Sequence, residues 1–210
     1  MAGLWYPILV ILVAGYMLGN LNGAVMISAI FANEDVRQHG SGNAGLTNYI
    51  RNYGAGTALL VIAIDGGKAV VACLVGRLIF AGLDPMLGGT LGGLGVMLGH
   101  TLPAMLAFKG GKGILSGFCV AMTLDWRIGL MILGCFLLFY LTSRYVSLGS
   151  VMGAIGFSIA FLIFHFDNLP VAIIGAFMGG LAVYMHRSNI VRLVKGQERK
   201  TNLFARSNKQ

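Results

Sequence analysis

The chain has 210 residues, of which 57% are hydrophobic and only 10% are charged, and its formal net charge is +8. Together with a mean hydropathy of +0.80, this composition excludes an ordinary soluble domain and indicates an integral membrane protein. The apolar runs are continuous and do not alternate with polar residues. This excludes an outer-membrane barrel and predicts an all-α fold, a bundle of membrane helices.

Seven apolar segments follow one another, separated by short polar stretches. We expect membrane spans near 4–32, 57–83, 86–107, 114–124, 128–142, 148–166 and 169–185. Segments 114–124 and 128–142 are short for a spanning helix, which needs about 20 residues. The pattern by itself therefore also permits one helix interrupted by Asp125, Trp126 and Arg127.

The distribution of positive charge decides whether 114–124 and 128–142 are two spans or one interrupted helix. The tail 186–210 carries seven of the fifteen Lys and Arg residues, and the positive-inside rule places it in the cytoplasm. The stretch containing Lys109 and Lys112 is also basic, so an even number of spans must separate it from the tail. We therefore expect one polytopic domain over residues 1–210 with seven transmembrane helices, the N-terminus outside and the C-terminus cytoplasmic. We expect most of the tail cations to contact membrane lipids. We expect no nucleic-acid partner.

The first predicted cytoplasmic loop is rich in glycine, hydroxyl and amide side chains, and we call residues 40–48 the glycine loop. Glycine lets several backbone N–H groups approach one anion, and the polar side chains add donors. Helix connections usually need only about 2–8 residues, which disfavours a simple flexible linker. The candidate phosphate-binding residues are Gly40, Ser41, Gly42, Asn43, Gly45, Thr47, Asn48 and, just beyond the loop, Arg51.

The second candidate is the sequence Phe108-Lys109-Gly110-Gly111-Lys112-Gly113, which we call the lysine loop. It opens directly into an apolar segment, so free N–H groups, a helix dipole and two ammonium groups would gather at one place, as a phosphate requires. The alternative is that Lys109 and Lys112 are snorkelling anchors at the membrane edge. Anchors need no glycines between them, which favours phosphate binding.

The sequence gives weaker indications of a site at four further positions. Ser147 and Ser150 lie in a third cytoplasmic loop, and His186 and Asn189 are three residues apart, on one face of a helix at the start of the tail. Asp65 and Lys68 are also three apart, within an apolar segment where charges are costly and tend to pair. They either neutralise each other or line the site. The three cysteines show no ligand spacing, so we expect no metal site.

The strings GSGNAGLTN, FKGGKG, RYVSLGS and HRSNI occur in this order between apolar spans, and in this the chain resembles the PlsY family of acyl-phosphate-dependent glycerol-3-phosphate acyltransferases. The likeness runs nearly end to end and includes the Asp65 and Lys68 pair and the Gly99-His100 approach to the lysine loop. Two departures are Leu46, where the family usually has a small residue, and residues 19–23, which replace a more usual Gly-Ser-Ile-Pro type of sequence. They affect acyl-chain fit and the shape of the first helix more than the chemistry.

The resemblance implies a seven-helix enzyme of the bacterial inner membrane, its active site facing the cytoplasm. It would transfer a fatty acyl group from acyl phosphate to the 1-hydroxyl of glycerol 3-phosphate, giving lysophosphatidic acid and phosphate, as the first step of phospholipid synthesis. The resemblance implies that Ser41, Asn43, Thr47 and the lysine loop hold acyl phosphate, and that Arg51, Ser147, His186 and Asn189 orient glycerol 3-phosphate. The implied catalytic set is Ser41, Asn43, Thr47, Lys112 and His186, with no cofactor and no metal.

Soluble-type glycerol-phosphate acyltransferases use a His with an Asp five residues later. Here the residues five after the four histidines are Ala44, Met105, Pro170 and Val191, so no such dyad is expected. We expect a substrate phosphate, or secondarily His186, to accept the hydroxyl proton. The alternatives from other classes are an organic-phosphate membrane transporter, which would commonly show repeated halves, and a lipid-binding scaffold, which would not need three donor-rich loops.

Overall fold

The computed structural model describes residues 4–201, so the tail cations Arg206 and Lys209 lie outside the described residues. Within this range every regular element is helical, which confirms the all-α fold. The elements are α1 (Trp5–Asn20), α2 (Gly23–Ala32), η1 (Val36–Gln38), α3 (Leu46–Tyr53), α4 (Ala58–Ile79), α5 (Pro85–Thr101), η2 (Ala104–Leu106), α6 (Ile114–Leu124), α7 (Trp126–Ser143), α8 (Val146–Phe164), α9 (Leu169–Met185) and α10 (Arg187–Val194).

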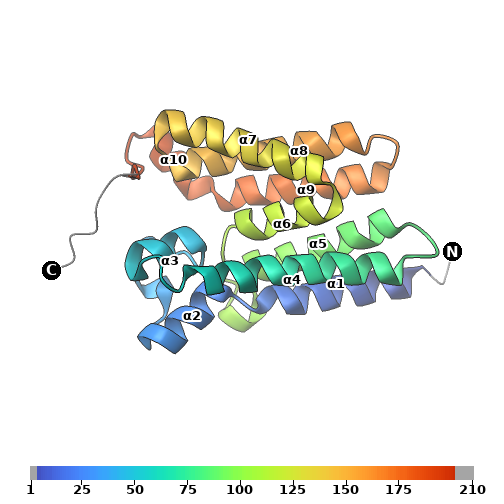
Figure 1. The fold of residues 1–210 in the computed structure, drawn as a ribbon, viewed down its shortest axis with the longest axis horizontal. Coiled ribbons are helices and arrows are strands. Elements are labelled where there is room, and N and C mark those ends of the chain that lie inside the picture. The colour runs from blue at the N-terminus through green and yellow to red at the C-terminus, as the bar shows by residue number, and fades with distance from the viewer. Residues whose placement is uncertain (1–3, 202–210) are drawn as a thin grey trace.

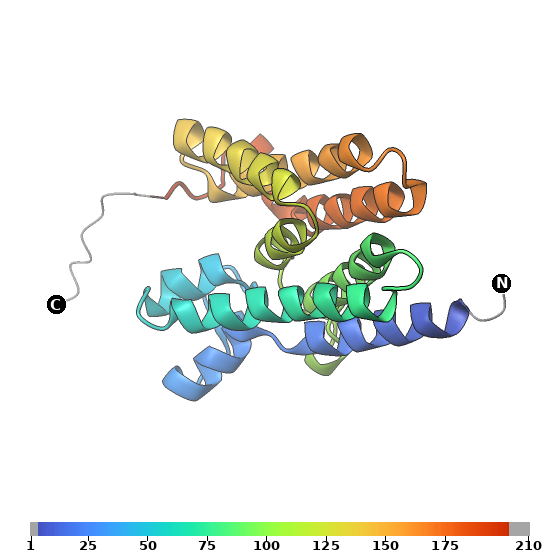
Figure 2. The same cartoon turned by 45° about the vertical axis from the view of Figure 1, so that its right-hand side comes forward.

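The long helices form two groups that run roughly parallel to one another (Figure 1). One group holds α1, α4 and α5, the other holds α7, α8 and α9, and α6 lies between the two in both ribbon views (Figure 2). The short helices α2, α3 and α10 gather at the end of the bundle opposite the start of α1. The loops that the sequence marks as polar and glycine-rich therefore meet at one end of the molecule, which we call the loop end.

The predicted segments 114–124 and 128–142 are two separate helices, α6 and α7. Asp125 ends the first and caps the second, because its carboxylate accepts a hydrogen bond from Arg127 N at 3.0 Å. Among the described residues, four helices are long and apolar enough to cross a membrane, or five if α9 and α10, which meet at a bend of 55°, count as one span. At 11 residues α6 is only about 17 Å long, roughly half of the ~30 Å hydrocarbon layer.

The predicted first span, 4–32, is a broken helix: α1 ends at Asn20 and α2 begins at Gly23. A break inside an apolar segment exposes backbone groups that must find partners. Lys68 Nζ donates to Gly19 O at 3.1 Å and Leu21 O at 2.5 Å, while Asp65 Oδ1 accepts from Gly23 N at 3.0 Å. The ion pair between them, 2.8 Å long, therefore satisfies both ends of the break.

Glycine residues set how closely α5 packs against α1. A Cβ added to Gly19 would come within 2.4 Å of Val96 O, and one added to Gly99 would come within 2.1 Å of Tyr16 O. Larger side chains would force the backbones apart, so these glycines permit a helix contact of the small-residue type common in membranes. The contact fixes the C-terminal turn of α5, which carries His100, beside the break between α1 and α2.

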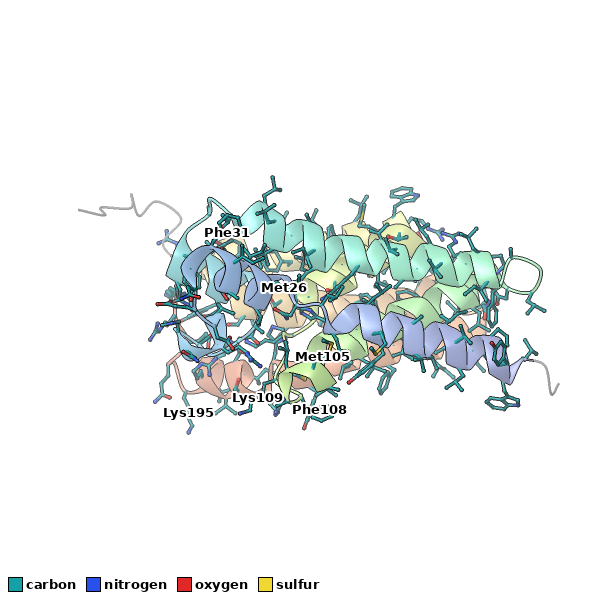
Figure 3. The ribbon with its side chains drawn as sticks, turned by 90° about the horizontal axis from the view of Figure 1, so that it is seen from below. Met26, Phe31, Met105, Phe108, Lys109 and Lys195 are labelled. Carbon is teal, nitrogen blue, oxygen red and sulfur yellow. The ribbon has the colours of Figure 1, made fainter. Side chains whose placement is uncertain are left out.

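Large apolar side chains are exposed on almost every helix, for example Leu59 at 71% and Leu78 at 74% on α4. Such a belt would be an aggregation surface in water and is suited to lipid. Figure 3 shows Met105 and Phe108 close to Lys109. The apolar belt therefore meets a cationic side chain here, as expected where a membrane surface begins.

Candidate active site

A cavity of about 580 Å³ opens at the loop end, and we call it the main cavity. Its polar wall combines the glycine loop, the lysine loop, the start of α8 and the tail. Thirteen of the sequence-predicted site residues line it: Gly40, Ser41, Asn43, Gly45, Thr47, Asn48, Arg51, Lys112, Gly113, Ser147, Ser150, His186 and Asn189. Segments more than 100 residues apart in sequence thus share one site.

The glycine loop is shaped by the buried side chain of Asn48. Its amide nitrogen donates to three backbone carbonyls, those of Val36, His39 and Asn43, at 3.0 to 3.1 Å, and its oxygen accepts from Ser41 N at 2.9 Å. Gly40 and Gly42 have positive φ values of 62° and 69°, which glycine adopts without strain. Asn48, predicted as a ligand to substrate, uses its amide to hold the loop and therefore acts by positioning it.

Three helices begin at the main cavity without a side-chain cap. The N-cap residues are Gly45 for α3, Gly113 for α6 and Tyr145 for α8, and none accepts a hydrogen bond through its side chain. The first N–H groups of a helix lack an intrahelical acceptor, and the helix dipole adds partial positive charge there. Three such ends at one cavity form a binding surface for anions.

Lys112 lies in the wall of this cavity, and its Nζ donates to Asn189 Oδ1 at 2.5 Å. Burial lowers the pKa of Lys112 to about 8, and the nearby positive charges of Arg192 and Arg51 act in the same direction. Four cationic side chains, those of Arg51, Lys112, Arg192 and Arg199, therefore line one cavity that has only two carboxylates, Asp65 and Glu198, in its wall. An anionic ligand would relieve this repulsion and keep Lys112 protonated.

The tail contributes one carboxylate to the same network. Glu198 accepts from Asn189 Nδ2 at 2.8 Å and from Arg192 Nε at 2.7 Å. Burial acts to raise the pKa of Glu198, but these hydrogen bonds outweigh burial and hold the pKa below its ordinary value. Glu198 is therefore ionised at neutral pH and orients Asn189, whose oxygen is in turn directed at Lys112.

His186 and Ser147 are buried in the cavity wall, 3% and 7% exposed. His186 Nδ1 lies 2.8 Å from Ala182 O, and because a carbonyl can only accept, Nδ1 carries the proton and Nε2 is left with its lone pair. Burial lowers the pKa of His186 to about 4, so the ring is neutral at pH 7. Ser147 Oγ makes no hydrogen bond of normal geometry within residues 4–201, although it lies close enough to Glu198 to help lower the pKa of that carboxyl.

Four predicted residues lie outside the main cavity. Gly42 and Lys109 line a second cavity of about 460 Å³ together with Arg37. Gly110 and Gly111 pack against the end of α5: Gly111 N donates to His100 O at 3.0 Å, and a Cβ on Gly110 would meet that same carbonyl at 2.1 Å. The two lysines of the lysine loop thus face different spaces, which their spacing in sequence did not reveal.

The sequence left open whether Asp65 lines the site, and the structure places it there together with three residues that the sequence did not select. Asp65 and His100 line the main cavity, as do Arg192 and Glu198 of the tail. The tail cations were interpreted as lipid contacts, because charge alone does not show where α10 folds back. The sequence did indicate that Asp65 is unusual, because a charged side chain is costly inside an apolar segment. This cost predicts that the carboxylate has a partner, but not where that partner lies.

The main cavity continues from its polar wall into an apolar arm between α6, α7 and α8. Its lining there includes Leu115 and Phe118 from α6, Leu133 and Phe136 from α7, and Gly153 from α8. A ligand that fills both parts would carry an anionic head and a hydrocarbon tail. The cavity therefore fits an amphipathic phosphate compound.

Comparison with known proteins agrees with this geometry. The sequence model of the family described as Glycerol-3-phosphate acyltransferase matches residues 9–196. The glycerol-3-phosphate acyltransferase of Thermoanaerobacter sp. (strain X514) is 36% identical over 195 residues, covering 93% of this chain and 96% of the relative. That of Clostridioides difficile (strain 630) is 37% identical over 197 residues, with coverage of 93% and 96%.

Two solved structures share the fold. Both are crystal structures of PlsY (YgiH), an integral membrane glycerol 3-phosphate acyltransferase. Its glycerol 3-phosphate form matches with a TM-score of 0.82 and 31% identity, covering 93% of this chain and 96% of the other. Its lysophosphatidic acid form matches with a TM-score of 0.80 and 30% identity, covering 93% and 95%. This chain belongs to the glycerol-3-phosphate acyltransferase family.

Proposed function

We propose that this acyltransferase takes a fatty acyl group from acyl phosphate and transfers it to the 1-hydroxyl of glycerol 3-phosphate, releasing lysophosphatidic acid and inorganic phosphate. The observation that carries the proposal is the main cavity, where three uncapped helix ends and four cations meet an apolar arm. Both substrates carry phosphate, and the donor and the product each carry an acyl chain. One cavity of this shape accommodates all of these groups.

The donor phosphate binds between the glycine loop and the start of α6, with Lys112 and the side chains of Ser41, Asn43 and Thr47 around it. The side chains of those three loop residues make no hydrogen bond within the described part of the chain. Glycerol 3-phosphate binds towards the tail, against Arg51, Ser147, His186 and Asn189. This division places two anions on separate cations and brings the glycerol hydroxyl next to the donor.

Acyl phosphate is a mixed anhydride with a good leaving group. The glycerol oxygen adds to the carbonyl carbon, the bond from that carbon to the phosphate oxygen breaks, and inorganic phosphate leaves. Positioning and electrostatic stabilisation supply most of the acceleration. A phosphate oxygen of the substrates accepts the hydroxyl proton, and His186, neutral with a free Nε2, orients the hydroxyl.

We further propose that the helices form one membrane domain with seven spans and that the loop end faces the cytoplasm of a bacterial inner membrane. Helix α6 is too short to cross the bilayer alone, so the lysine loop would enter the membrane from the cytoplasmic side. Single-cysteine variants labelled from either side of sealed vesicles would test this. Labelling of Lys195→Cys from outside the cell and of Asp167→Cys from inside would contradict the orientation.

The activity is tested with purified protein, glycerol 3-phosphate and one donor at a time: acyl phosphate, acyl-CoA or acyl carrier protein. We expect lysophosphatidic acid from acyl phosphate only, and in EDTA-treated protein as well. Formation from another donor, or a requirement for added metal ion, would contradict the scheme. Uptake of glycerol 3-phosphate into proteoliposomes without any product would indicate a transporter instead.

The role of His186 has its own test. Because a substrate phosphate is the proposed proton acceptor, His186→Ala should lower kcat by about tenfold at most, the loss of one orienting hydrogen bond of about 1 kcal/mol. A loss of the ~10²- to 10⁴-fold expected for removal of a general base would identify His186 as the base.

A further inference from the structure

His100 lies in the last turn of α5, and its side chain is only 4% exposed. Its Nδ1 is 3.0 Å from Lys68 Nζ and 3.5 Å from Asp65 Oδ1. The ring nevertheless lines the main cavity. This histidine therefore joins the buried ion pair on one side to the site on the other.

Nδ1 has two possible partners, Lys68 Nζ as a donor and Asp65 Oδ1 as an acceptor, and the shorter separation, 3.0 Å against 3.5 Å, favours the contact with Lys68. An ammonium group can only donate, so Nδ1 accepts, and the proton of a neutral imidazole must sit on Nε2. Lys68 is itself held in place by Asp65 and by the two carbonyls at the break between α1 and α2. The tautomer of His100 is therefore set by Lys68 and Asp65, which also bind the backbone at the break between α1 and α2.

The Nε2–H group faces the junction of the glycine loop and the lysine loop. A Cβ on Gly111 would lie 2.2 Å from Nε2 and 2.8 Å from Ala44 O, so both loops pass beside this atom. Within residues 4–201, only Ser147 Oγ and His165 Nε2 are fully enclosed side-chain atoms without a partner. His100 Nε2 also has none, so it must be reached from the cavity.

We propose that His100 is a further catalytic residue, whose Nε2–H donates a hydrogen bond to the carbonyl oxygen of the acyl donor, and that Lys68 is the positioning residue that fixes its tautomer. This proposal rests on the proposed function. As the glycerol oxygen bonds to the carbonyl carbon, the carbonyl electron pair moves onto the oxygen facing His100. The pair returns when the bond to phosphate breaks, and His100 neither gains nor loses a proton.

The position of His100 along the bundle indicates that it faces the carbonyl oxygen of the acyl donor and not the donor phosphate. His100 is level with Asp65 of α4, whose backbone carbonyl accepts from Ser116 Oγ in the first turn of α6 at 3.1 Å. The proposed phosphate position is at Lys112 and Gly113, just before that turn, and the apolar arm begins at Leu115. The carbonyl group, which joins phosphate to chain, then falls beside His100. A neutral donor there acts mainly on charge that develops in the transition state.

The test is steady-state kinetics of His100→Ala and His100→Gln with acyl phosphate. Loss of one such donor costs about 10²- to 10³-fold in kcat, so we expect that loss for His100→Ala with the KM for glycerol 3-phosphate near its wild-type value. His100→Gln, which restores an N–H donor, should recover part of the lost kcat. The backbone carbonyl that holds Gly111 is unchanged in both variants.

His165 provides a matched control, because it is a buried histidine 3.5 Å from a carboxylate, Asp125, at the other end of the bundle. His165→Ala should leave kcat within about twofold of wild type, since it removes no contact to the site. The proposal is overturned if His100→Ala keeps near wild-type kcat, or if only KM for glycerol 3-phosphate rises.

A spectroscopic measurement tests the tautomer without any substitution. In protein labelled with ¹⁵N-histidine, NMR at neutral pH should show His100 with a protonated Nε2 and an unprotonated Nδ1. The opposite pattern would contradict the proposal. If wild-type protein makes product from another acyl donor, the proposed function fails, and the same His100 kinetics with that donor still decide the role of His100.

Discussion

The two ends of the helix bundle contrast in how their polar groups are used. At the end away from the main cavity, Asp84, Asp125 and Asn168 each cap the following helix, α5, α7 or α9. They also bind one another or a neighbour: Asn168 Nδ2 donates to Asp84 Oδ2 at 2.7 Å, and Arg127 pairs with Asp125 at 2.6 Å. Side chains therefore cap three of the helices that begin at that end, and α1, whose N-cap residue Leu4 makes no side-chain cap, is the exception.

The loop end does the reverse. Helices α3, α6 and α8 begin there without side-chain caps, Ser147 Oγ is buried without a partner, and Lys112 faces other cations. Each of these features costs stability unless a ligand supplies the missing partner. The contrast is the one expected if a bound anion completes the loop end, as proposed above, whereas at the opposite end the protein itself supplies most of the helix caps.

The largest effect should come from removing Lys112. Lys112→Met takes away the cation proposed to bind the donor phosphate, and we expect kcat/KM for acyl phosphate to fall by about 10²- to 10³-fold. The matched control is Lys109→Met, which alters the neighbouring lysine in the second cavity. Equal losses in the two variants, measured by product formation, would show that the two cavities are not functionally separate.

The pH dependence of the reaction should report Lys112. Its ammonium form binds phosphate, and with a pKa of about 8 that form is present below pH 8 and declines about tenfold for each pH unit above it. After correction for spontaneous donor hydrolysis, kcat/KM, which reports the free enzyme, should fall accordingly. Lys112→Arg should abolish this inflection, because arginine stays charged. An unchanged profile in that variant would assign the inflection elsewhere.

Ser147→Ala should separate function from stability at the loop end. The hydroxyl makes no hydrogen bond of normal geometry within residues 4–201, so its removal should leave the melting temperature in detergent nearly unchanged. We expect kcat/KM for glycerol 3-phosphate to fall by about fivefold, corresponding to one hydrogen bond of roughly 1 kcal/mol. A destabilised variant would mean that the hydroxyl is already used by the fold.

Asp125→Ala should produce the opposite result at the other end. It removes the cap of α7 and the partner of Arg127, and we expect a loss of about 1–2 kcal/mol in unfolding free energy. Turnover at a temperature where the variant is folded should change less than twofold. A large loss of kcat without loss of stability would break the contrast between the two ends.

Several features of this protein can be predicted from short stretches of its sequence. Continuous apolar runs predict membrane helices because the hydrocarbon layer leaves backbone groups no other partner. The separation of α6 from α7 follows from charge balance and from Asp125. The glycine loop and the lysine loop stand out in the sequence because closely spaced glycines and hydrogen-bond donors are typical of anion sites.

Other features depended on contacts between distant segments. Only the folded chain shows that Lys109 and Lys112 face different cavities, that Asn48 holds the glycine loop, and that the tail returns Glu198 to the site. The break in the first apolar segment could not be predicted either, because hydropathy carries no information about backbone hydrogen bonds. Asp65, Lys68 and His100 come from two helices, and their roles arise from one shared set of contacts. Residue type and local spacing determined which chemistry was present; helix packing decided which groups meet.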